Sequence, residues 1–115
     1  MTIPTGAGTE VLKRNSAESR DNQTTKIIDG VANHIYTVLS IIISNNGSSA
    51  ANLDIFVAPS ASGTLYLVRS DTNLPGKGTF VFSDRIVLTG TDELSVYCAS
   101  ADHDIYVSYI DQDWT

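Results

Sequence analysis

Apolar and polar residues alternate in short runs along most of this chain, and turn-forming residues separate the runs. The pattern is clearest in residues 35–44, 53–58, 64–69, 79–83, 85–89, 94–99 and 105–110, and residues 24–28 begin the series. Side chains of a strand point alternately to its two faces, so each run predicts a strand with one face toward a core. Short strands at this spacing predict an antiparallel sandwich or barrel.

Two details of the pattern refine this prediction. The stretch Val38-Leu39-Ser40-Ile41-Ile42-Ile43 is almost continuously apolar, which predicts a central strand covered on both faces. Pro75-Gly76 predicts a type II turn, in which Gly76 supplies the positive φ angle.

Residues 1–23 differ in composition from the rest of the chain. Thr, Gly, Ser, Asn, Glu and Arg dominate there, and Val11-Leu12 is the apolar pair. We expect an extended N-terminal arm over residues 1–23, with a short strand at 9–14 and a polar loop at 16–23. Residues 24–115 then form the β-sandwich domain.

Length and charge exclude several classes of protein. A chain of 115 residues fits one domain. Seven basic and thirteen acidic residues give a net charge of −6, which disfavours nucleic acid and anionic membranes as partners. The single cysteine cannot form an intramolecular disulfide. Residues 1–20 lack the apolar core of a signal peptide, so we expect synthesis in a cytoplasm.

Two acidic clusters are candidates for metal or acid–base chemistry. Asp102-His103-Asp104 lies in a predicted hairpin loop, and no second histidine lies near it in sequence. Zinc sites need three or four convergent ligands, so we expect a solvated loop. Asp111-Gln112-Asp113 lacks the longer ligand series of a calcium loop, so we expect a solvated C-terminal segment. We therefore expect neither a metal nor another cofactor.

No catalytic set stands out elsewhere. The chain has no Gly-x-Ser-x-Gly nucleophile elbow, and Gly6-Ala7-Gly8 neither follows a predicted strand nor opens a helix. Cys98 falls in an apolar alternation, where a buried side chain is expected. We therefore predict that the protein is not an enzyme.

The aromatic residues leave two possibilities open. Tyrosines on strand surfaces can form a sugar-binding face, or they can pack at a rim or a subunit contact. Tyr97 and Tyr106 are the candidates for such a glycan or interface face. Trp114 is expected to dock on the domain or on a partner, because a large apolar ring is unfavourable in water.

The chain resembles small bacteriophage virion proteins of the capsid decoration, cement or minor head–tail type. The resemblance covers residues 24–111, and strand-and-turn segments carry it: Ile35-Tyr36-Thr37-Val38, Ile41-Ile42-Ile43-Ser44-Asn45, Leu74-Pro75-Gly76, Phe80-Val81-Phe82, Arg85-Ile86-Val87-Leu88, Gly90-Thr91-Asp92-Glu93-Leu94 and Asp104-Ile105-Tyr106-Val107-Ser108-Tyr109-Ile110. It implies a jelly-roll-like sandwich and no catalytic residues.

Together these observations predict an all-β protein, an antiparallel, jelly-roll-like β-sandwich of about eight strands preceded by an extended arm. The expected function is that of a non-enzymatic capsid decoration or cement protein, located in the virion, that binds the major capsid protein or other virion proteins. A homo-oligomer, with a trimer as the expected form, fits such a role. A neck or tail component and a glycan-binding module are the alternatives. The expected contact residues are Ile3, Pro4, Val11, Leu12 and Trp114.

Overall fold

The computed structural model describes residues 9–19, 23–61, 66–99 and 102–114. In these segments lie nine strands: β1 (Thr9–Ser19), β2 (Gln23–Asp29), β3 (His34–Asn45), β4 (Ala51–Ala58), β5 (Tyr66–Leu74), β6 (Thr79–Phe82), β7 (Ile86–Thr89), β8 (Glu93–Cys98) and β9 (His103–Asp113). A short 3-10 turn, Pro59–Ala61, follows β4.

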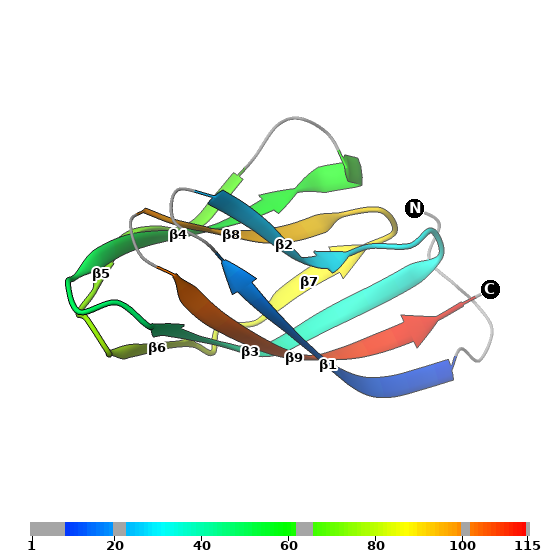
Figure 1. Ribbon diagram of the computed structural model, residues 1–115. Helices are drawn as coiled ribbons and strands as arrows, with labels where there is room; N and C mark the ends of the chain where they lie inside the picture. The colour runs from blue at the N-terminus through cyan, green and yellow to red at the C-terminus, as the bar shows by residue number, and fades with distance from the viewer. Residues whose placement is uncertain (1–8, 20–22, 62–65, 100–101, 115) are drawn as a thin grey trace.

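The strands form two antiparallel sheets that face each other (Figure 1). Sheet A has the order β1-β9-β3-β6, and β7 also pairs with β3; sheet B has the order β2-β8-β4-β5. The first strand thus pairs with the last, the second with the eighth, and the fourth with the fifth. A long hairpin rolled into two layers gives this order, which is that of a jelly roll. The predicted fold class is confirmed.

The core lies between the two sheets and is made of aliphatic side chains. Val38 and Ile41 from sheet A and Ile55 and Val96 from sheet B are fully buried there. Burying one such side chain stabilises the fold by roughly 1.5–3 kcal/mol, so these inward stripes hold the layers together. Cys98 is fully buried in the same layer, as its alternation predicted.

β3 is central, as its apolar run predicted, but only one of its faces is covered. It pairs with β9 on one side and with β6 and β7 on the other. Its inner side chains are buried, whereas Leu39 and Ile42 on the opposite face are exposed. The prediction that both faces are covered is therefore wrong within this chain, because no second layer lies over the outer face of sheet A among the described residues.

The N-terminal region contains a longer strand than its sequence suggested. β1 pairs with β9 without a break from Thr9, opposite Asp113, to Ser19, opposite His103. The polar loop predicted for residues 16–23 is wrong at residues 16–19 and 23, which are strand. Pairing with β9 supplies the backbone hydrogen bonds, and no apolar alternation is needed for that. The arm boundary at residue 23 stays a prediction, and Ile3 and Pro4 lie outside the described residues.

The turn after β5 also differs from the prediction. The Gly78 N–H donates to the Pro75 carbonyl oxygen at 2.9 Å, so Pro75 is the first residue of the turn. Lys77, not Gly76, has the positive φ angle, 61°. Gly76 is needed for a different reason: a Cβ atom there would collide with the backbone of Ser48. The predicted placement of the turn, with Pro75 and Gly76 at its two central positions, is therefore wrong: Gly76 and Lys77 occupy them.

Candidate functional site

The outer face of sheet A carries a band of apolar side chains that this chain leaves in contact with solvent. Its members are between 37% and 72% exposed, and they are Leu12, Leu39, Ile42, Val81, Val87 and Tyr106. The strand registers arrange them in rows across the sheet. One row runs Ser16–Tyr106–Ile42–Val81, and another runs Leu12–Ile110–Thr37–Val87.

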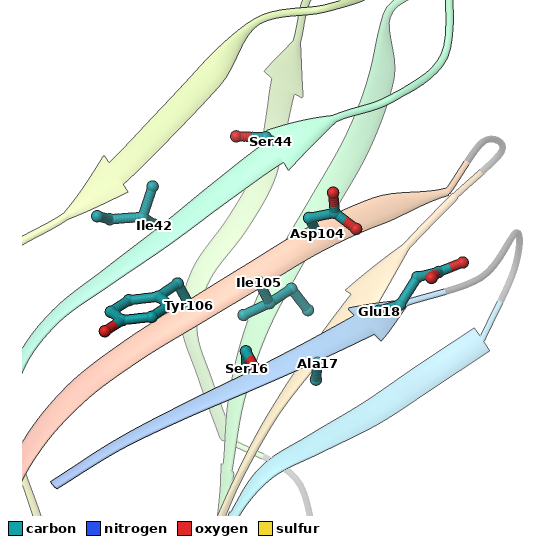
Figure 2. A pocket seen from close by; sticks show the side chains of 8 residues that line it. All are labelled: Ser16, Ala17, Glu18, Ile42, Ser44, Asp104, Ile105 and Tyr106. Carbon is teal, nitrogen blue, oxygen red and sulfur yellow. The ribbon is translucent and has the colours of Figure 1, made fainter.

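Two open hollows mark this face, one on each side of Tyr106. The first has a volume of about 410 Å³ and lies over β1, β9 and β3, between Ser16, Ile42 and Asp104 (Figure 2). The second, of about 540 Å³, lies between Leu12, Leu39 and Tyr106. Both are shallow and open to solvent, which suits contact with another surface better than enclosure of a small molecule.

The tyrosines do not gather on one face. Tyr106 points outward from sheet A, whereas Tyr97, on β8, points outward from sheet B, on the other side of the sandwich. Tyr36 is buried, and its ring lies 6.0 Å from that of Tyr109. Tyr97 and Tyr106 therefore cannot act together on one ligand, and a glycan site at either one alone stays a prediction.

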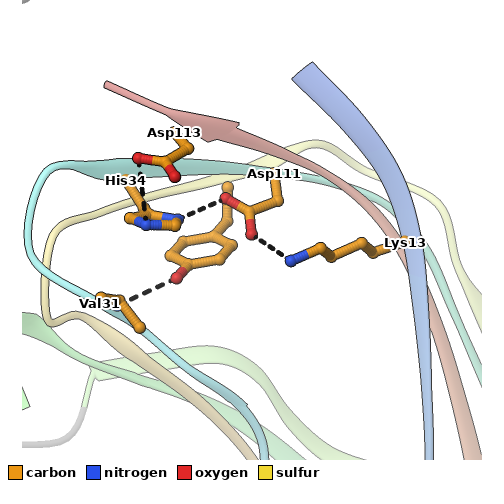
Figure 3. Close-up of polar contacts among 6 residues, drawn as sticks. Lys13, Val31, His34, Asp111 and Asp113 are labelled. Atoms are coloured by element: carbon orange, nitrogen blue, oxygen red, sulfur yellow. Dashed lines mark hydrogen bonds and ion pairs between the residues drawn. The ribbon is translucent and has the colours of Figure 1, made fainter. Parts of the chain in front are cut away.

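A buried carboxylate organises one end of the sandwich (Figure 3). Asp111 of β9 accepts a hydrogen bond from Lys13 Nζ at 2.8 Å and another from His34 Nδ1 at 2.7 Å. His34 Nε2 lies 3.4 Å from a carboxylate oxygen of Asp113. Nearby, the Tyr36 hydroxyl accepts a hydrogen bond from the Val31 N–H. We call Lys13, His34, Asp111 and Asp113 the Asp111 cluster. The prediction that Asp111 is solvated is wrong, because it faces inward on β9.

The electrostatics of the Asp111 cluster favour its charged form. Burial by itself raises the pKa of Asp111, but the hydrogen bonds from Lys13 and His34 outweigh that effect and hold the pKa below its ordinary value. The hydrogen bond to Asp111 raises the pKa of Lys13 in turn. The cluster thus joins β1, β9 and β3, the three neighbouring strands that carry these side chains.

The Asp111 cluster does not have the arrangement of a catalytic triad. In a triad one ring nitrogen of histidine contacts a carboxylate and the other faces a nucleophile. Here Nδ1 contacts Asp111 and Nε2 faces Asp113, which is a second carboxylate. Since a carboxylate can only accept hydrogen bonds, Nδ1 carries a proton, and the histidine acts as a link between strands.

The opposite end of sheet A is closed by buried polar residues. Asn45 donates to the carbonyl oxygens of Ser49 and Leu74 and accepts from the Gly47 N–H. His103, which opposes Asn45 in the sheet register, is fully buried. The solvated loop predicted for Asp102-His103-Asp104 is wrong at His103 and Asp104, which belong to β9. The apolar pattern begins only at residue 105 and therefore missed the start of this strand.

The expected contact residues are placed as follows. Leu12 lies in the apolar band, and Val11, which faces the other way, is about half-exposed. Trp114 is half-buried on its own domain, where its backbone N–H donates to the Asn33 carbonyl oxygen. Its indole Nε1 is buried and has no hydrogen-bond partner among the described residues. Their role in binding a partner stays a prediction.

No group of three or more His, Cys, Asp or Glu side chains among the described residues could hold a metal ion. No helix within the same residues has the length and apolar character needed to cross a membrane.

The sequence matches no protein-family model and no curated protein, but several solved structures share the fold. A chain of the Bacillus endospore appendages, a family of disulfide-linked pili, is 14% identical with a TM-score of 0.58, and the match covers 100% of this chain and 97% of that one. A chain of the acid-stable capsid of Helicobacter pylori bacteriophage KHP30 is 11% identical with a TM-score of 0.58, over 90% and 92% of the two chains. A chain of infectious bursal disease virus, Gx strain, is 9% identical with a TM-score of 0.51, over 93% of this chain and 32% of that one. At such identities the likeness concerns the fold, which this chain shares with chains of viral particles and of a pilus.

Proposed function

We propose that this protein is a non-enzymatic structural protein of a bacteriophage particle, a capsid decoration or cement protein that binds the major capsid protein through the outer face of sheet A. The observation that carries the proposal is the apolar band on that face. Large exposed apolar patches mark interaction surfaces, because leaving them in water is unfavourable. The band lies over the middle of the sheet, where Leu39 and Ile42 belong to the central strand β3.

The shape of this face favours a macromolecular partner. Its two hollows are open, and together they extend across β1, β9 and β3. The exposed Asp104 lies at the end of the first hollow, so a partner with a basic side chain there complements its charge. A shell offers many equivalent binding positions, and repeated weak contacts gain strength through multivalency.

The similar fold of a chain from a phage capsid supports a virion location. Synthesis in the host cytoplasm is part of the proposal and stays a prediction. The Bacillus appendages are disulfide-linked, but we propose no disulfide between copies of this chain. Cys98 is fully buried, and burial raises the pKa of its thiol to about 11, so it is a poor partner for another chain. Self-association is part of the proposal, and the trimer expected from sequence stays a prediction.

A double substitution in the band tests the proposal. Val81 and Val87 are exposed on β6 and β7, so V81E/V87E places charge on the outer face without entering the core. Leu67→Glu is the matched control, because Leu67 is similarly exposed but belongs to sheet B. Particles assembled with each variant are purified, and copies per particle are counted by quantitative mass spectrometry.

We expect V81E/V87E to reduce occupancy at least about tenfold, since two charges would be buried against an apolar surface, and L67E to leave it unchanged. Equal occupancy of V81E/V87E and the unsubstituted protein contradicts the proposal. The copy number also separates the alternatives: a decoration protein occurs in many copies, whereas a neck or tail component occurs in few. If L67E and V81E/V87E both bind glycans on a glycan array, and to the same extent, the result would favour a glycan-binding module.

A further inference from the structure

β1 forms an open edge of sheet A. It pairs with β9 along its full length, and among the described strands none lies beyond it in the sheet. Its residues from Thr9 to Ser16 are all exposed. An edge strand presents a row of backbone N–H and C=O groups without partners, which is a template for pairing with another strand.

Only the first part of this edge is accessible. Near its end β1 approaches sheet B: the side-chain amide of Asn15 donates to the Ile27 carbonyl oxygen at 2.8 Å, and the Ser19 hydroxyl donates to that of Gln23 at 3.1 Å. The accessible edge is therefore the segment of residues 9–14. It contains no proline and no bulge, two devices by which sheet proteins protect their edges.

The charged side chains of this segment suit pairing with the same segment of a second copy. Glu10, Leu12 and Arg14 lie on the same outer face, since alternate residues of a strand share a face. Among the described residues no carboxylate forms an ion pair with Arg14, which is exposed. Glu10 accepts a hydrogen bond from Gln112 through one oxygen, which leaves the other carboxylate oxygen available.

We propose that the β1 edge pairs with β1 of a second copy of this chain, antiparallel, about a two-fold axis at Leu12. In this register Leu12 opposes Leu12 of the second copy, and Glu10 of each copy opposes Arg14 of the other. Directly opposed residues of an antiparallel pair interact through their side chains, and opposite charges there are stabilising. The contact thus combines an apolar centre with two flanking ion pairs.

Neighbouring registers fit less well. An axis at Arg14 would oppose Arg14 to itself and Glu10 to Glu18, which places like charges together. An axis at Ser16 would pair Arg14 with Glu18, but it requires the part of β1 that lies against β2. The register centred on Leu12 is the one that uses only the accessible edge and opposes unlike charges.

This pairing goes beyond the proposed function, because it requires no shell and can be measured on the isolated protein. It makes sheet A continuous across two copies, so the row that begins at Leu12 extends into the second molecule. A short ladder buries less surface than a stable dimer needs, so we expect a weak dimer in solution. The trimer expected from the sequence would require a contact through a surface other than the β1 edge.

A cysteine scan along the outer face of β1 tests both the contact and its register. Opposed residues of an antiparallel pair have Cα atoms about 4.5–5.5 Å apart, within the range for a disulfide. We expect L12C to form a disulfide-linked dimer under mild oxidation at least about tenfold faster than R14C or S16C. Cys98 does not interfere, because it is buried. Similar rates for the three variants, or the fastest rate at residue 14 or 16, would overturn the proposal.

A charge exchange provides an independent readout in the L12C background. E10R and R14E should each slow cross-linking about tenfold, because each creates two like-charge pairs. The double variant E10R/R14E should restore the rate, since the pairs reform with the charges exchanged. Thermal unfolding of each variant verifies the fold. Failure of the double variant to recover, with the fold intact, contradicts the pairing of Glu10 with Arg14.

Discussion

Replacement of Asp111 by asparagine tests the role of the Asp111 cluster in stability. Asp111 is 5% exposed and accepts hydrogen bonds from Lys13 and His34 at 2.8 and 2.7 Å. An asparagine at this position would keep the shape of the side chain but remove its charge. A hydrogen bond to a charged group contributes roughly 1.5–3 kcal/mol, and the half-exposed Lys13 contributes at the low end because water screens it.

We therefore expect D111N to lower the free energy of unfolding by about 2 kcal/mol at pH 7, which corresponds to a fall in Tm of about 8 °C. The assay is urea unfolding followed by circular dichroism. Asp113→Asn is the control: Asp113 is 44% exposed and 3.4 Å from His34, so we expect a loss below about 0.5 kcal/mol.

The dependence on pH gives the prediction a second check. The pKa of Asp111 in the folded protein lies below its ordinary value, so its contribution is present above about pH 4 and is lost as the pH falls through the folded pKa. The difference in stability between D111N and the unsubstituted protein should therefore shrink on acidification. A D111N protein as stable as the original at pH 7, or a difference that grows on acidification, would refute this reasoning.

Three further predictions follow from single features of the fold. Cys98 should resist a thiol reagent at pH 8 in the folded protein and react with one equivalent in denaturant, because it is fully buried and its thiol pKa is about 11; rapid labelling of the folded protein would contradict this. Gly76→Ala should lower the free energy of unfolding by more than about 1 kcal/mol, because the new methyl group would meet the Ser48 backbone, whereas Gly90→Ala meets no atom and reports only the cost of its positive φ angle. Deletion of residues 1–8, which removes Ile3 and Pro4 and keeps all of β1, should abolish attachment to particles if these two residues bind the shell; unchanged occupancy would remove them from the contact.

The alternation of apolar and polar residues predicted most of the strands, because burial of one face leaves a clear period of two. β3, β4 and β6 to β8 lie within two residues of their predicted limits. The pattern failed where pairing rather than burial defines the strand. Residues 16–19 of β1 contain no large apolar side chain and become strand because β9 lies beside them.

The site was harder to predict for a related reason. Asp111 and His103 are polar residues at inward positions, and sequence alone does not show which partner compensates a buried polar group. The partners of Asp111 come from β1 and β3, far from it in the chain. The apolar band was missed for the same reason: only the registers of four strands show that Leu12, Tyr106 and Val81 lie on one face of sheet A. The apolar run of β3 did carry a signal for this band, because it indicated that both faces of the strand are covered.

The pairing of the first strand with the last has a consequence for how the molecule is made. Thr9 has its partner in Asp113, so β1 leaves the ribosome long before the strand that completes it has been synthesised. Until then, the newly made β3 also lacks one of its neighbours, and its apolar side chains are open to other nascent chains. Because distant contacts form slowly, the interval before β9 arrives is the period in which chaperones would protect the protein most.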